Sequence, residues 1–355
     1  MIEYILVLEL LPETTSDYTC RIGDIFVLNI QEIAKLAGVS VATVSRVINQ
    51  KPNISAKTYE KVMAVMQQEN YSPNAIARGL SLNSMNVIGV IVDDIRNLYR
   101  ANVVYSLEDQ LSQNGYNTLI FNSGPKGSAK FSQVLQQHPD ALIFVGSSLG
   151  SIDVKNFIEK SFSDKPVLMY NGQLDLPNTI SVICDEYIGQ QMIADHLYRT
   201  GRRTPVYIDY PKTPASQRKL SGFSDKAKEL GLNFDKSSIV IADSGGFEGG
   251  QEAAKSIIGR DVHFDAVVCS LDLLALGAMF ILKQYGYRIP QDTAVTGFDN
   301  LTYGKLSSPF LTSVDGNVEK MSSVAVDNLI RCIGGGAFPK EPIYILPSLY
   351  LGGTS

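Results

Sequence analysis

The segment from residue 30 to residue 49 constrains the fold of this chain more strongly than any other. Its apolar residues recur at i, i+3, i+4 and i+7, the stripe of a short amphipathic helix, at Ile30, Ile33, Ala34 and Ala37. Gly38 ends that helix, and Ser40 can cap a second helix from Val41 to about Asn49. Two short helices joined by a tight turn that contains glycine predict a helix-turn-helix.

The expected outer face of the second helix is small, polar and basic: Ala42, Ser45, Arg46 and Asn49. Such a face can come close to the floor of a DNA major groove, which bulky acidic side chains would prevent. A third helix is expected from Ser55, and Lys51, Lys57 and Lys61 lie where DNA phosphates would pass. Any short helical pair can show the same spacing, so the pattern by itself leaves DNA binding and plain packing open.

The net charge of −5 is distributed unevenly along the 355 residues. Residues 29–84 hold six basic and three acidic residues, whereas residues 1–28 hold five acidic residues and one basic residue. Net acidity therefore does not argue against DNA binding, because the basic segment coincides with the expected helix-turn-helix. A secretory signal begins with basic residues, but the first apolar run here follows Glu3. We expect residues 1–28 to be an N-terminal extension or the result of a misplaced start.

The four cysteines show no close spacing: Cys20, Cys184, Cys269 and Cys332. Scattered cysteines argue against a disulfide framework or a zinc cluster and favour a reducing compartment. Hydrophobic residues at 45% and charged residues at 19% are typical of an ordinary globular protein that does not enter membranes. We therefore expect a cytoplasmic protein with no metal and no cofactor.

From residue 87 onward, apolar runs alternate with amphipathic helical stretches. The runs cover residues 87–92, 118–121, 141–145, 167–170, 206–208, 239–242, 266–269 and 293–298. This alternation predicts an α/β fold with parallel sheets, and there are too many strands for one small sheet, which favours two lobes. In such folds, ligands bind beyond the carboxyl ends of the strands.

Three consecutive segments resemble the DNA-binding domain of the lactose and galactose repressor (LacI/GalR) family. They are residues 38–49 (GVSVATVSRVIN), 55–58 (SAKT) and 71–78 (YSPNAIAR). Residues 185–189 (DEYIG), 275–279 (ALGAM) and 295–300 (VTGFDN) extend the resemblance over residues 29–351. It implies a helix-turn-helix domain at 29–73, a hinge helix and linker at 74–84, and a two-lobed, periplasmic-binding-protein-like effector and dimerisation domain at 85–355.

The same resemblance implies roles for individual residues in DNA binding. Val41, Ala42 and Arg46 would contact bases, and Arg46 suits a bidentate contact to guanine. The residues expected mainly on phosphates are Ser40, Thr43, Ser45 and Asn49. Leu80, in the hinge helix, would wedge between base pairs in the minor groove. A homodimer bound to near-palindromic double-stranded operator DNA is therefore expected.

The effector-site residues implied by the resemblance are Tyr99, Asp185, Lys219, Phe247 and Asp299. Carboxylates, a cation and aromatic faces suit a hydroxyl-rich ligand. Lys219 stands where the family usually has arginine, and the adjacent Arg218 could take its role. Leu271 replaces the usual asparagine, and Arg100 follows Tyr99 where a second aromatic residue is common. These departures leave the identity of the effector open.

Two further motifs bear on the function of the second part of the chain. Asp272 is expected to cap a helix that starts at Leu273. The stretch 146–150 (GSSLG) matches the nucleophile elbow of a serine hydrolase, but the downstream histidines, His196 and His263, are poorly placed for a triad with Ser148.

The sequence thus predicts a transcriptional repressor, not an enzyme, that is controlled by a sugar or sugar derivative. A sugar-binding protein without operator binding is the main alternative.

Overall fold

The computed structural model describes residues 29–48, 52, 54–69, 71, 84–124, 131–210, 213–260 and 262–355. The chain divides into two compact units, Met1–Ser81 and Leu82–Ser355. The described part of the first unit, here called the head, is residues 29–71 with the gaps given above. None of the described helices is long and apolar enough to cross a membrane.

The head contains three helices, α1 (Ile30–Leu36), α2 (Val41–Ile48) and α3 (Ala56–Gln68). Asn29 begins α1 with a capping box, in which its side chain accepts from the Glu32 amide and the Glu32 carboxylate accepts from the Asn29 amide. Gly38 turns the chain with a φ of +57°, which glycine adopts without strain. The buried core residues come from all three helices: Ile33, Ala34, Ala37, Val44, Val47, Val62 and Met66. The expected helix-turn-helix is confirmed.

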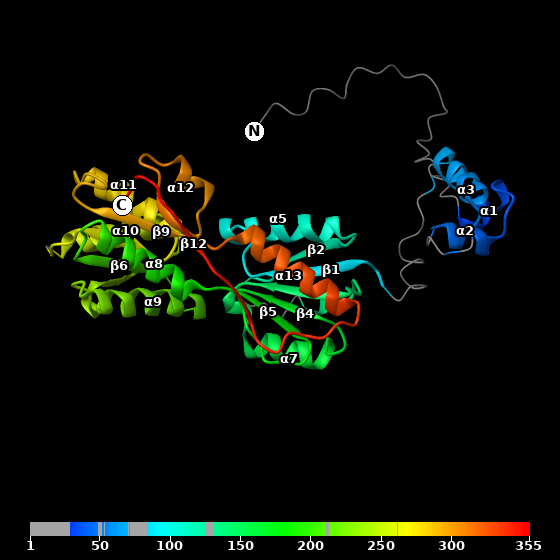
Figure 1. The fold of residues 1–355 in the computed structure, drawn as a ribbon, viewed down its shortest axis with the longest axis horizontal. Helices are drawn as coiled ribbons and strands as arrows, with labels where there is room; N and C mark the ends of the chain where they lie inside the picture. Colours follow the sequence, from blue (N-terminus) through cyan, green and yellow to red (C-terminus); the bar gives the residue numbers. More distant parts are fainter. Residues whose placement is uncertain are drawn as a thin grey trace, which may run out of the picture. The chain divides into compact units, whose positions relative to one another are not determined.

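The second unit contains two lobes, each built on one six-stranded sheet. The sheet of the first lobe has the order β11-β5-β4-β3-β1-β2, and all its strand pairs are parallel. Its strands are β1 (Val87–Val92), β2 (Asn117–Asn122), β3 (Ala141–Val145), β4 (Val167–Tyr170), β5 (Thr179–Cys184) and β11 (Ile343–Ile345). Its helices are α5 (Leu98–Gln113), α6 (Phe131–Leu135), α7 (Ile152–Ser161) and α13 (Val318–Ile333), with η2 (Ser147–Leu149) after β3. α5 and α13 pack together over one face, and α7 covers the other (Figure 1).

The sheet of the second lobe has the order β12-β10-β9-β8-β6-β7. Its strands are β6 (Pro205–Asp209), β7 (Ile239–Ile241), β8 (Ala266–Cys269), β9 (Ala294–Phe298), β10 (Thr312–Asp315) and β12 (Ser348–Tyr350). They are parallel apart from β12, which runs antiparallel to β10. Its helices are α8 (Glu186–Arg199), α9 (Pro214–Leu230), α10 (Phe247–Gly259), α11 (Asp272–Gln284) and α12 (Thr302–Leu306), with η3 (Lys236–Ser238). The pair α8 and α9 covers one face of the sheet, and the pair α10 and α11 covers the other (Figure 1).

The chain passes between the two lobes three times. It crosses between β5 and α8 at Asp185, between β10 and α13 near Asn317, and between β11 and β12 near Leu346. Hydrogen bonds join the crossing segments, since the Asp185 amide donates to the Ile345 carbonyl at 2.9 Å and Asn317 Nδ2 donates to the Leu346 carbonyl at 2.8 Å. All three crossings leave carboxyl ends of strands, so these ends are the part of each lobe nearest the other. The expected two-lobed α/β architecture is confirmed.

Candidate functional site

The outward face of α2 presents the residues expected to read DNA bases. Val41, Ala42 and Arg46 are exposed, while Val44 and Val47 are buried against the other helices. Because a helix has 3.6 residues per turn, burial of Val44 and Val47 turns Arg46 outward. The Val41 side chain is 41% exposed, so it lies on the same open face as Ala42 and Arg46.

The residues expected on phosphates lie around the start of α2 and α3. Ser40 is exposed, its Oγ accepts from the Thr43 amide at 3.1 Å, and its hydroxyl lies 2.9 Å from the Thr43 hydroxyl. Ser45 is half-buried, and Lys57 is exposed in the first turn of α3. Asn49 and Leu80 lie outside the described residues. The head therefore places Thr43 and Arg46 on α2 and Ser40 directly before its first residue.

In the second unit, Lys219 and Asp299 form the centre of the candidate effector site. Lys219 extends from α9, and its Nζ donates to the Ser270 carbonyl at 3.0 Å, lies 3.9 Å from Asp299 Oδ1 and lies 3.8 Å from the centre of the Phe298 ring. Both charged side chains are buried. Burial raises the pKa of the Asp299 carboxyl to about 6, although the positive charges of Lys219 and Arg100 lower it.

Tyr99 reaches the same region from the first lobe. It lies in the first turn of α5, and its hydroxyl accepts a hydrogen bond from Asn171 Nδ2 at 2.9 Å. Burial raises the pKa of the Tyr99 hydroxyl well above its usual value, and the negative charge of Asp299 acts in the same direction. Tyr99 is therefore protonated and lies within electrostatic reach of Asp299. We call Tyr99, Arg100, Lys219 and Asp299 the interlobe site.

Asp185 and Glu186 stand at the first crossing between the lobes. Asp185 caps α8, because its Oδ1 accepts from the Ile188 amide at 3.1 Å. Glu186 is buried and accepts from Arg218 Nε at 2.7 Å, with Arg218 Nη2 at 2.6 Å. Arg218 is thus engaged with Glu186, whereas Lys219 is directed toward Asp299. This geometry favours Lys219 over Arg218 as the cation of the interlobe site.

Phe247 and Asp272 differ from the other candidates. Phe247 begins α10, and its ring packs against Phe280 of α11, with the ring centres 5.7 Å apart. No contact described for its side chain joins it to Lys219 or Asp299. The interpretation of Asp272 as a helix cap was wrong, because α11 starts at Asp272 itself and the carboxylate accepts from the Leu301 amide and the Ser313 hydroxyl, both at 2.6 Å. Burial raises the pKa of Asp272 to about 8.

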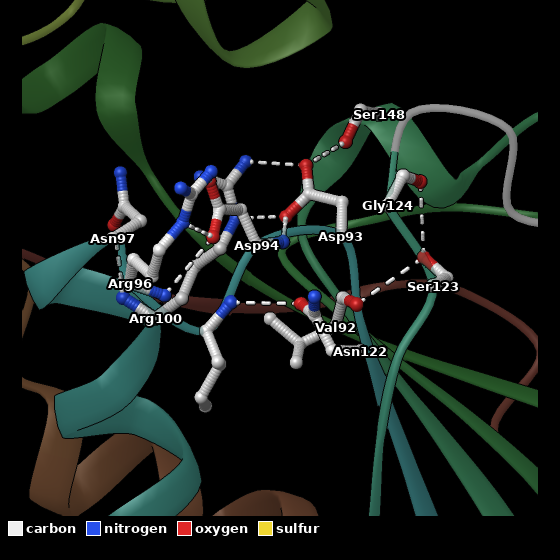
Figure 2. Close-up of polar contacts among 11 residues, drawn as sticks. Val92, Asp93, Asp94, Arg96, Asn97, Arg100, Asn122, Ser123, Gly124 and Ser148 are labelled. Carbon is white, nitrogen blue, oxygen red and sulfur yellow. Dashed lines mark hydrogen bonds and ion pairs between the residues drawn. The ribbon is translucent and has the colours of Figure 1, made fainter.

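A cluster that the sequence analysis missed lies at the carboxyl ends of β1 and β3. Asp93 is paired with Arg100, with Nε 2.5 Å from Oδ1 and Nη2 donating to Oδ2 at 2.8 Å. Figure 2 shows the Asp93 carboxylate between Arg100 and Ser148, whose hydroxyl donates to Oδ2 at 2.9 Å. The signal in the sequence was weak: an acidic residue directly after an apolar strand, with a basic residue seven positions later.

The same contact argues further against the serine-hydrolase alternative. A nucleophilic serine needs its hydroxyl hydrogen-bonded to a base such as histidine, but the Ser148 hydroxyl donates to a carboxylate that is already paired with an arginine. His196 lies in α8 and contacts the Ser355 hydroxyl at 2.8 Å. The geometry of Ser148 therefore does not form a catalytic triad with His196.

Comparisons with known proteins agree with this architecture. Residues 29–74 match the model of the bacterial regulatory proteins of the lacI family, and residues 194–355 match a periplasmic binding protein-like domain. An HTH-type transcriptional regulator from Lachnoclostridium phytofermentans is 33% identical over 319 residues, which cover 88% of this chain and 96% of that protein. The chain belongs to the lacI family of bacterial regulatory proteins. It is a transcriptional regulator and not an enzyme.

Further relatives support the same family. The HTH-type transcriptional regulator DegA from Bacillus subtilis is 30% identical over 90% of this chain and 96% of that protein. Among solved structures, the lac repressor dimer bound to operator and the anti-inducer ONPF has a TM-score of 0.81 at 23% identity, over 92% of this chain and 98% of that chain. The complex of the transcriptional regulator CelR with cellobiose has a TM-score of 0.69 at 24% identity, over 92% and 100% of the two chains. These structural likenesses show the shared fold.

Proposed function

We propose that this lacI-family regulator is a repressor that binds near-palindromic operator DNA as a homodimer. Val41, Ala42 and Arg46 of α2 would contact bases, while Ser40, Thr43, Ser45 and Lys57 would contact phosphates. The exposure of Val41, Ala42 and Arg46 on one helical face supports this assignment. The relative solved as a dimer on its operator supports the assembly. The proposal extends to the sequence segments 29–73, 74–84 and 85–355 as its domains, and to Asn49 and Leu80 as DNA contacts.

The effector in this proposal is a small hydroxyl-rich molecule, a sugar or sugar derivative, held between the lobes. The observation that carries it is the interlobe site, where Lys219 and Asp299 of the second lobe lie within electrostatic reach of Tyr99 and Arg100 of the first. A ligand that contacts both sets would favour one arrangement of the lobes and so couple effector binding to operator binding. We also include Asp185 among the effector-binding residues, because it lies at a crossing between the lobes. Phe247 is included only because the family resemblance implies it.

A mobility-shift titration with the DNA upstream of the gene tests the proposal. The wild type and Asp299→Asn are titrated with and without each member of a panel of sugars and sugar derivatives. We expect at least one compound to change the operator affinity of the wild type, and Asp299→Asn to bind the same DNA without that response. Operator binding that no compound alters would contradict the effector assignment, and absence of specific binding would favour a sugar-binding protein without an operator.

A further inference from the structure

The Asp93 carboxylate lies at the centre of a group of polar contacts on the first lobe (Figure 2). Besides the two contacts with Arg100, it accepts from the Ser148 hydroxyl at 2.9 Å and from the Asp94 amide at 2.8 Å. The side chains of Asp93 and Arg100 remain 22% and 24% exposed, so the pair is not sealed inside the lobe. A bidentate ion pair with further donors on the carboxylate holds the guanidinium in one place.

Two observations indicate that this cluster faces the second lobe. Ser148 belongs to η2, which contacts α9, the helix that carries Lys219. The charge of Arg100 also acts on Asp299, whose pKa it lowers. Tyr99 and Arg100 both lie in the first turn of α5, so both belong to the end of this helix that follows β1.

Each cation in or beside the interlobe site already has a carboxylate partner. Arg100 is paired with Asp93, Arg218 with Glu186, and Lys219 lies 3.9 Å from Asp299 while it donates to a carbonyl. To form an ion pair with Arg100, an anionic ligand would have to break the ion pair between Arg100 and Asp93. The partly buried Asp93 carboxylate would then have no cation beside it. That loss is costly, because removing one partner of such a pair strands the other charge. A neutral hydroxyl-rich ligand needs no such exchange.

We propose that Asp93 is a specificity-determining residue: by neutralising Arg100, it makes the interlobe site select an uncharged hydroxylated ligand and reject phosphorylated or carboxylated forms. The proposal rests on the proposed effector site, because it assigns the chemical class of the ligand that binds there. Asp93 acts as a repulsive element against the wrong ligand as well as an anchor for Arg100. Its removal should turn Arg100 into a free anion-binding group.

The test uses inorganic phosphate as the probe and needs no knowledge of the effector. The phosphate Kd of the full chain is measured by calorimetry at pH 7.5 for the wild type, Asp93→Asn and Asp94→Asn. Asp94 is the matched control, because it pairs with Arg96 two residues away on an exposed surface, with side chains 40% and 87% exposed (Figure 2). We expect Asp93→Asn to bind phosphate at least about tenfold more tightly than the wild type, and Asp94→Asn to match the wild type.

The double variant Asp93→Asn/Arg100→Gln should lose the gain, since the freed cation is then absent. If Asp93→Asn does not unfold cooperatively, Asp93→Ser removes the same carboxylate with a smaller side chain and is measured in its place. Equal phosphate affinity in the wild type and the Asp93 variant would overturn the proposal. So would a gain that survives in the double variant.

A second arm separates this proposal from the proposed function. Thermal shifts of the wild type are compared for matched pairs of a neutral sugar and its phosphate ester, and we expect only neutral members to stabilise it. Greater stabilisation by an ester than by its parent sugar would overturn the role of Asp93. The mobility-shift titration, by contrast, decides whether any ligand controls operator binding, so the failure of one proposal is visible without the failure of the other.

Discussion

The head and the interlobe site use the same basic residue types in opposite ways. On the head, Arg46 and Lys57 are exposed, and neither forms an ion pair among the described residues. At the interlobe site, Arg100 and Lys219 are held by Asp93 and Asp299. Unpaired exposed cations suit a polyanion, because they release counterions on contact with phosphates. In our proposal, the paired and partly desolvated cations of the interlobe site instead order a surface for a neutral ligand.

The sharpest way to break this comparison is to remove the buried cation of the interlobe site and measure folding stability. We expect Lys219→Met to lower the free energy of unfolding by about 3 kcal/mol, because Asp299 loses its buried partner and the Ser270 carbonyl loses its donor. Urea denaturation followed by circular dichroism provides the measurement. Lys226→Met on the same helix is the control, with a much smaller expected loss, because its partners Glu229 and Asp195 are exposed and half-buried. Similar losses for the two variants would contradict a structural pairing of Lys219.

The pH dependence of stability sharpens the same contrast. The pKa of Asp299 is about 6 in the folded protein, against a usual value of 3.8. Between pH 3.8 and pH 6, the folded state therefore keeps a proton on Asp299 that the unfolded state has released. Stability contributed by protonated Asp299 is therefore lost as the pH rises from about 4 to 6, up to about 3 kcal/mol relative to Asp299→Asn. Parallel stability profiles of the two proteins across this interval would show that Asp299 is not held in a desolvated position.

On the head, loss of a cation should weaken DNA binding and leave folding unchanged. We expect Arg46→Ala to cost about 1 to 3 kcal/mol on the specific operator and less on random DNA, because a base contact is lost while phosphate contacts remain. Fluorescence anisotropy with both DNAs measures the difference, and urea denaturation serves as the folding control. An equal loss on both DNAs would remove Arg46 from base recognition.

The smallest expected effect concerns Lys57. Lys57→Ala should weaken binding to all DNA sequences by a similar factor and reduce the slope of log K against log salt by about one. The binding constant is measured at several salt concentrations with operator and random DNA. A slope equal to that of the wild type would place Lys57 away from the phosphates and weaken the contrast with the paired cations of the interlobe site.

Local patterns made the head and the alternation of strands predictable. The spacing of Ile33, Ala34 and Ala37, followed by Gly38, describes contacts within one or two helical turns, and the head contains those helices. Asp299 could be proposed as an effector-site residue because residues 295–300 resemble a motif of the family. Its pairing with Lys219, 80 positions earlier in the chain, could not be derived from periodicity.

The contacts that local patterns could not predict join residues that lie far apart in sequence. Asp272 precedes a helix and so resembled a cap, yet its carboxylate binds Leu301 and Ser313, which are 29 and 41 positions away. Ser148 fitted a nucleophile motif, yet its hydroxyl contacts Asp93, 55 positions earlier.

The sequence by itself determined the local elements: a capped helical pair with an exposed basic face, and apolar runs long enough for buried parallel strands. These depend on contacts between neighbouring residues, which periodicity and capping record directly. Only the tertiary structure decided which charges meet, because parallel sheets bring the ends of distant strands to one edge. The contact of Asp93 with Ser148 joins the ends of β1 and β3, and the pair of Lys219 and Asp299 joins α9 to the end of β9. Whether a cation there is free or neutralised depends on contacts that no local pattern encodes.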